Sequence, residues 1–173
     1  GLASAESRYQ SFTQLDDQQS AQVKIMADHE SKKLLKMPNN DYLELPDEVQ
    51  AAFNQCKELH TMLVFTQDID SLISTCDEAF SAGAADAAFL IGESLLSAQW
   101  TSPDYITAFE YLEKSSKNGS RSAKRYLIGA YQDPRLPINN SARAYDLAEE
   151  LAQQGMKWDI MNFSAMQAMG KDP

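Results

Sequence analysis

The pattern of apolar and polar residues predicts helices throughout this chain. Runs in which apolar and polar residues alternate, as they do along a half-buried strand, are absent, and so are the turns that would join such strands. Alanine, leucine, glutamine and glutamate are common while valine is scarce, which favours helix over strand. We therefore expect an all-α protein.

Residues that typically begin or end helices mark the predicted boundaries. Pro46 and Asp47 begin one helix over 47–64, and a second helix is expected over 68–82. Both are short enough for ordinary globular helices. The other boundary residues are the candidate N-cap segment Ser102-Pro103-Asp104, the alternative N-caps Asn139 and Asn140, and the C-cap glycines Gly119 and Gly155.

Each end of the chain carries a further predicted helix. Residues 3–37 are expected to form one long, polar helix that packs lightly as a cap, pairs with a partner or acts as a spacer. Residues 156–170 contain an apolar face that runs from Trp158 to Met169. We expect this face to cover the end of the preceding helices and, where it is wide enough, to bind a partner.

The middle of the chain repeats with a period of about 36 residues. Leu90-Ile91-Gly92 returns as Leu127-Ile128-Gly129, an offset of 37 residues. The segment 108–119 returns as 144–155, an offset of 36 residues, and both copies begin with Ala and an aromatic residue and end with Gly. Each repeat is therefore expected to contain two helices, the first of which holds the Leu-Ile-Gly segment.

The same period organises the flanking segments. One period upstream, residues 47–83 match as a degenerate repeat. One period downstream, Ala165 takes the position of Gly129 in a helix that has no second helix after it. The predicted order is thus a degenerate repeat over 47–83, repeats over 84–119 and 120–155, and a capping helix over 156–170.

These repeats resemble the Sel-one-like family, a branch of the tetratricopeptide-like helical solenoids. The matching residues are Ala87, Ile91-Gly92, Asp104, Ala108 and Gly119 in one repeat, and Ala123, Ile128-Gly129, Tyr131, Ala144 and Gly155 in the other. The resemblance implies a short right-handed α-α superhelix of two to three helical hairpins over 47–173. An N-terminal helix and linker over 1–46 would precede it, and the implied role is protein–protein interaction.

A glycine in the middle of a helix needs an explanation, because it costs about 1 kcal/mol relative to alanine. Both Leu-Ile-Gly segments carry one, at Gly92 and Gly129. We expect each glycine to lie opposite a small residue of the second helix, Ala108 or Ala144. The two backbones could then approach with no Cβ between them.

Cys56 and Cys76 are the only cysteines of the chain. They fall on different helices of the degenerate repeat, and Cys56 lies 36 residues before Gly92. Some secreted bacterial relatives of the Sel-one-like family staple the two helices of a repeat in this way, so the resemblance implies a Cys56–Cys76 disulfide outside the cytoplasm. The alternative is two buried free thiols in a cytosolic protein.

The charge of the chain is strongly negative and unevenly distributed. The net charge of −10 argues against nucleic-acid binding, which needs clustered Lys and Arg. Residues 38–83 hold nine acids and a single base, Lys57, whereas residues 120–155 have a net charge of +1. This asymmetry is either an ordinary solvated surface or a means of orienting a partner. No apolar run of about 18 residues predicts a membrane span.

The sequence predicts no metal site, no cofactor and no catalytic centre. His29 and His60 stand apart without the spacing of metal ligands. His60 follows Cys56 by four residues on one helix face, but a disulfide at Cys56 would remove that nucleophile. Phosphate-binding loops and nucleophile elbows are absent. We therefore expect a protein that is not an enzyme.

The resemblance implies a scaffold or adaptor of the bacterial periplasm or envelope, which binds a protein or peptide partner in a groove lined by first helices. One alternative is an inhibitor or immunity-type protein that blocks a basic partner with the acidic 38–83 surface. Since the chain begins at Gly1 rather than Met, a preceding signal peptide or lipid anchor is one interpretation. The expected groove contacts are Glu93, Gln99, Lys124, Arg125 and Gln132.

Overall fold

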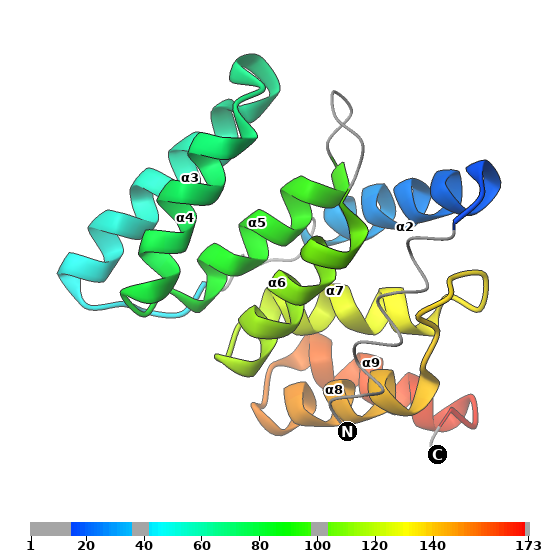
Figure 1. The fold of residues 1–173 in the computed structure, drawn as a ribbon. Coiled ribbons are helices and arrows are strands. Elements are labelled where there is room, and N and C mark those ends of the chain that lie inside the picture. Colours follow the sequence, from blue (N-terminus) through cyan, green and yellow to red (C-terminus); the bar gives the residue numbers. More distant parts are fainter. Residues whose placement is uncertain (1–14, 36–41, 98–103, 172–173) are drawn as a thin grey trace. The chain divides into compact units, whose positions relative to one another are not determined.

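The computed structural model describes residues 15–35, 42–97 and 104–171, and within these ranges it contains helices and no strand (Figure 1). The prediction of an all-α protein is confirmed, whereas the superhelical arrangement of repeats stays a prediction. The helices are α2 (Asp17–Leu35), α3 (Asp47–Thr66), α4 (Ile69–Ser81), α5 (Ala85–Ser97), α6 (Tyr105–Lys117), α7 (Arg121–Gln132), α8 (Ser141–Gln153) and α9 (Lys157–Ala168).

The helices fall into two units by their internal contacts. The first, which we call the hairpin unit, spans residues 35–123 and contains α3 to α6 and the start of α7. The second, the terminal unit, combines residues up to 34 with residues from 124 onward. α2 therefore belongs to the same unit as the C-terminal helices, although the sequence pattern sets the segment 1–46 apart from 47–173.

The hairpin unit contains two helical pairs, α3 with α4 and α5 with α6, and α4 also packs against α5 (Figure 1). α5 is apolar on nearly all sides, and every residue from Ala85 to Gly92 is buried. A helix with this composition has to lie inside a core rather than on a surface. The larger buried residues of the hairpin unit, from α5 and from the helices α3, α4 and α6, are Phe53, Leu63, Leu72, Phe89, Leu96, Phe109 and Leu112.

Asp86 is buried in the first turn of α5 and joins three segments of the hairpin unit. Its carboxylate accepts a hydrogen bond from the backbone N–H of Leu43 at 3.0 Å and another from Ser120 Oγ at 2.6 Å. A buried carboxylate is tolerated when such bonds are made. Asp86 thus holds the segment before α3, at Leu43, and the residue directly before α7, Ser120, onto α5.

A capping box sets the start of α2 and corrects one predicted helix. The N–H of Asp16 donates to Gln19 Oε1 at 3.1 Å, and the N–H of Gln19 donates back to Asp16 Oδ1 at 2.7 Å. Asp16 is the N-cap, so α2 begins at Asp17 and residues 15 and 16 are not helical. The prediction of one continuous helix over 3–37 is therefore wrong at these two residues. Residues 3–14, 36 and 37 of that prediction lie outside the described ranges.

The other predicted caps are largely in place. Asp104 accepts a hydrogen bond from the N–H of Thr107 at 3.0 Å and caps α6, while Ser102 and Pro103 lie outside the described ranges. Asn140, one of the two alternatives, caps α8 through the N–H of Arg143 at 3.0 Å. Gly119 and Gly155 follow α6 and α8 with φ angles of +104° and +85°, which favour glycine as predicted.

α2 presents one buried face to the terminal unit. Its buried residues Val23, Met26, Ala27, Glu30 and Leu34 follow helical spacing, and the opposite side is exposed. This burial supports packing of the N-terminal helix on the rest of the chain, rather than a role as a spacer or in pairing with a partner. The loop between α7 and α8 also contributes to this unit, because Leu136 and Ile138 are buried.

The two Leu-Ile-Gly glycines have different neighbours. A Cβ at Gly92 would lie 2.9 Å from the carbonyl oxygen of Ala108 and 2.8 Å from Leu112 Cγ, so the expected close approach to Ala108 is present. The nearest atoms to a Cβ at Gly129 belong instead to the carboxylate of Glu30 on α2. The Glu30 side chain of α2 thus covers Gly129, and the predicted approach of Gly129 to Ala144 stays a prediction.

This difference predicts unequal effects of alanine at the two glycines. We expect Gly92→Ala to lower the free energy of unfolding by about 1 to 3 kcal/mol, because the backbone of Ala108 cannot move aside. Gly129→Ala should stay within about 1 kcal/mol of the wild type, because the Glu30 carboxylate can rotate away and alanine favours the helix. Urea denaturation of both variants tests this expectation, and a larger loss at Gly129 than at Gly92 would contradict it.

Candidate interaction site

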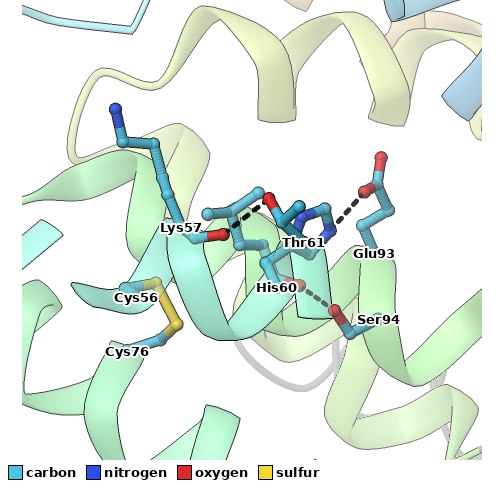
Figure 2. Close-up of a disulfide and its surroundings, with 8 residues drawn as sticks. Cys56, Lys57, His60, Thr61, Cys76, Glu93 and Ser94 are labelled. Carbon is cyan, nitrogen blue, oxygen red and sulfur yellow. Dashed lines mark hydrogen bonds and ion pairs between the residues drawn. A yellow bond between two sulfur atoms is a disulfide. The ribbon is translucent and has the colours of Figure 1, made fainter. Parts of the chain in front are cut away.

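A disulfide between Cys56 and Cys76 joins α3 to α4, with the two sulfur atoms 2.02 Å apart and the Cα atoms 4.8 Å apart (Figure 2). Both cysteines are fully buried, and the chain has no free cysteine. The predicted disulfide is confirmed, and the alternative of two free thiols is not what the structure shows.

The disulfide and the Gly92 contact occupy equivalent positions in their hairpins. Adding 36 to the numbers of Cys56 and Cys76 gives Gly92 and Leu112. Gly92 and Leu112 are in contact where α5 meets α6, since a Cβ at Gly92 would lie 2.8 Å from Leu112 Cγ. A disulfide therefore joins α3 to α4 at this position. At the position 36 residues later, Gly92 of α5 packs directly against Leu112 of α6.

A histidine and a glutamate connect the stapled hairpin to α5. His60 lies one turn after Cys56 on α3, and its Nε2 is 3.0 Å from Glu93 Oε1 (Figure 2). On α5, Ser94 Oγ donates to the carbonyl oxygen of Leu90 at 2.7 Å. Glu93 was expected to face a partner, but its side chain is mostly covered and engaged with His60. It therefore helps to position α3 relative to α5.

The tip of the α3–α4 hairpin exposes three large apolar side chains. Met62 is 43%, Val64 63% and Phe65 78% exposed, whereas Leu63 between them is buried. Sequence reasoning missed these residues, although the signal was present. Four consecutive apolar residues from Met62 to Phe65 cannot all point to one side of a helix, so some of them must face solvent.

The turn at this tip is short and well capped. Gln67 ends α3 with a φ angle of +54°, and its N–H donates to the carbonyl oxygen of Leu63 at 2.8 Å. Asp68 then caps α4, since its carboxylate accepts from the N–H of Ser71 at 3.1 Å and from Ser71 Oγ at 2.7 Å. These hydrogen bonds lower the pKa of Asp68 below its ordinary value.

Residues 38–83 carry many acids, and few basic residues lie among them to balance the negative charge near the tip. The one base of this segment, Lys57, lies with its Nζ 5.7 Å from the ring centroid of Tyr42 and 5.2 Å from that of Phe53. Lysine over two aromatic rings is a cation–π arrangement, which holds the ammonium on the body of the hairpin. The apolar tip is thus followed directly by the acids Asp68 and Asp70.

Two of the remaining predicted groove contacts lie inside the terminal unit rather than on its surface. Lys124 and Arg125 are buried, so the prediction that they face outward is wrong. The guanidinium of Arg125 donates to both carboxylate oxygens of Asp159, at 3.0 and 2.8 Å, and this buried ion pair ties α7 to α9. Gln132 is partly exposed, and Gln99 lies outside the described residues.

Gln132 also lines a cleft of about 530 Å³ in the terminal unit, and Glu30 is another of the lining residues. Burial raises the pKa of Glu30, while Lys33 and His29 act in the opposite direction. Lys33 Nζ is 4.0 Å from the Glu30 carboxylate, and Arg135 on the rim is paired with Asp133 at 2.9 Å. Glu30 and Arg135 of this cleft thus each lie near a residue of opposite charge in the same chain.

Neither metal coordination nor a membrane span is suggested by the part of the chain that the structure describes. It contains no group of three or more His, Cys, Asp or Glu residues arranged to hold a metal ion. Among the same residues, none of the helices has both the length and the apolar character needed to cross a bilayer.

No protein-family model, curated protein or solved structure matches this chain. The resemblance to Sel-one-like repeats therefore stays a prediction from the motifs quoted above.

Removing the disulfide should destabilise the hairpin unit. We expect Cys56→Ser/Cys76→Ser to lower the free energy of unfolding by about 3 kcal/mol, because the bridge closes a loop of about 20 residues in the unfolded chain. Urea denaturation with and without reductant measures the effect, and reductant should leave the double variant unchanged. Two reactive thiols in denatured protein that has not been reduced would contradict the bridge.

The Arg125–Asp159 pair should behave as a coupled unit. Asp159→Ala is expected to lower the free energy of unfolding by about 3 kcal/mol, because it leaves a buried guanidinium without its partner. Arg125→Met/Asp159→Leu should recover most of this loss, since it removes both charges and keeps the volume. Strictly additive losses from the two sites, measured by a double-mutant cycle, would be evidence against the pair.

Proposed function

We propose that this protein is a non-enzymatic binding protein that docks the tip of its α3–α4 hairpin onto a basic protein partner. The observation that carries the proposal is the group of three exposed apolar residues, Met62, Val64 and Phe65, at a turn within the most acidic part of the chain. This proposal follows the inhibitor or immunity-type alternative. The groove-binding hypothesis needs Lys124 and Arg125 to contact the partner, and both are buried.

The apolar residues of the tip would supply most of the affinity. Covering a large apolar side chain is worth about 1.5 to 3 kcal/mol, and interfaces commonly concentrate their energy in a few such residues. Phe65 is the largest and the most exposed of the three. A pocket that accepts Phe65, with Met62 one turn earlier on the same helix face at its edge, is the complementary feature to expect on the partner.

The acids around the tip would supply orientation and speed of association. Residues 38–83 have a net charge of −8, from nine acids and one base, and the base is held over two rings. A field of one sign steers a partner of the opposite sign and raises the association rate more than it slows dissociation. The partner surface around the pocket should therefore be rich in Lys and Arg.

The hairpin is also well suited to binding because it is already ordered. The Cys56–Cys76 bridge and the His60–Glu93 contact hold α3 at two successive turns, and Gln67 and Asp68 fix the turn itself. Less conformational entropy is lost on binding when the contacting segment is held in its bound form. The disulfide further favours an oxidising compartment, for which we propose the bacterial periplasm or envelope.

Crosslinking and site-directed variants test the proposed function. A photo-crosslinking residue at position 65 should capture a protein from an envelope extract that the same residue at Gln153, exposed on α8, does not capture. With that protein purified, Phe65→Ser should weaken binding at least tenfold, because an anchoring side chain is lost. Glu58→Lys/Asp70→Lys should slow association and reduce its dependence on salt.

Glu149→Lys/Glu150→Lys is the matched control, since it reverses two exposed acids in the terminal unit. This variant should bind like the wild type. If both pairs of charge reversals slowed association equally, the effect would come from net charge and not from the acids around the tip. Wild-type affinity in Phe65→Ser would overturn the proposal that the tip is the docking site.

A further inference from the structure

α9 has one face that is held by the terminal unit. Met166 is buried, and the ring of Phe163 packs on Tyr145 with the centroids 5.0 Å apart. Asp159 is buried in its ion pair with Arg125. These three residues fix the rotation of α9 about its axis, so the direction in which its other residues point is determined.

The opposite side of α9 forms an exposed stripe of four apolar residues, Trp158, Met161, Ala165 and Ala168. Trp158 is 45% and Met161 58% exposed, and both alanines are exposed as well. Their spacing of three, four and three residues places them in one line along the helix. The only charged residues of α9 are Lys157 and Asp159, and Asp159 points away from the stripe into its ion pair.

Three other residues occupy the same position of the predicted repeat as Ala165, and each of them lies against a neighbouring helix. Cys56 on α3 is bonded to α4, Gly92 on α5 lies against α6, and Gly129 on α7 lies against Glu30 of α2. In every case the neighbour is a helix. Ala165, 36 residues after Gly129, is exposed. The stripe on α9 therefore has the form of a helix-packing face that is exposed among the described residues.

We propose that α9 packs antiparallel against α9 of a second copy of this chain. In that arrangement Trp158 meets Ala168 of the other copy, and Met161 meets its Ala165, so that each large residue fits over a small one. A parallel arrangement would oppose large residues to large ones and leave gaps between the alanines. The order large, large, small, small along the stripe thus fits an antiparallel copy of itself.

The charge of the stripe also fits a second copy. The chain as a whole carries −10, so two copies repel each other over most acidic surfaces. The stripe contains no acid, and the exposed charge that borders it on α9 is Lys157. Contact through α9 therefore brings no carboxylate of one α9 stripe against a carboxylate of the other.

Sedimentation equilibrium of the intact protein tests the dimer. Between 1 and 200 μM, in about the range of weak helix–helix association, the mass should rise toward twice the 19.3 kDa of one chain. Ala165→Glu should raise the dissociation constant at least tenfold, because it places a carboxylate in the contact of each copy. Gln167→Glu adds the same charge elsewhere on α9 and should leave the dissociation constant unchanged, and circular dichroism verifies that both variants remain helical.

The orientation is tested by crosslinking through introduced cysteines. Met161→Cys mixed with Ala165→Cys should form a mixed disulfide faster than either variant does alone, because the antiparallel contact pairs residue 161 with residue 165. Faster self-crosslinking of Met161→Cys would overturn the antiparallel arrangement. A protein that stays monomeric at 200 μM, or a dimer that Ala165→Glu does not weaken, would overturn the proposal itself.

Discussion

The hairpin unit depends on one constraint, the close approach of the two helices in each of its pairs. In the α5–α6 pair a Cβ at Gly92 would strike the backbone of Ala108. In the α3–α4 pair the Cα atoms of Cys56 and Cys76 are 4.8 Å apart, close enough for sulfur atoms to bridge them. The conformational cost of glycine and the requirement for oxidation are two ways of accommodating the same crossing.

This constraint has consequences for the surfaces that the helices present. With α3 fixed to α4 at Cys56 and to α5 at His60, the apolar residues beyond them are left to face solvent at the turn. In the terminal unit a buried ion pair, Arg125–Asp159, plays the corresponding part for α9. In both units a buried contact fixes the rotation of a helix, and that rotation decides which apolar side chains remain exposed.

The sequence predicted the helices and most caps, because these follow from local propensity. The disulfide was implied by the family resemblance, with two free thiols as the alternative. It did not predict the neighbours of residues whose contacts come from distant segments. Gly129 faces Glu30, about 100 residues earlier, and Arg125 pairs with Asp159 on a different helix. Helical spacing shows which residues share a face, but the direction of that face depends on which helix arrives to cover it.

The most direct test of the shared crossing is a distance measurement between Gly92 and Leu112 in solution. In protein with labelled leucine methyl groups, a nuclear Overhauser cross-peak should connect the α protons of Gly92 with the methyl protons of Leu112, because these groups are in van der Waals contact. Such a peak would show that the α5–α6 pair crosses at the position equivalent to the disulfide. If the Leu112 methyl groups show cross-peaks to other residues of α5 and none to Gly92, the two hairpins do not share this crossing.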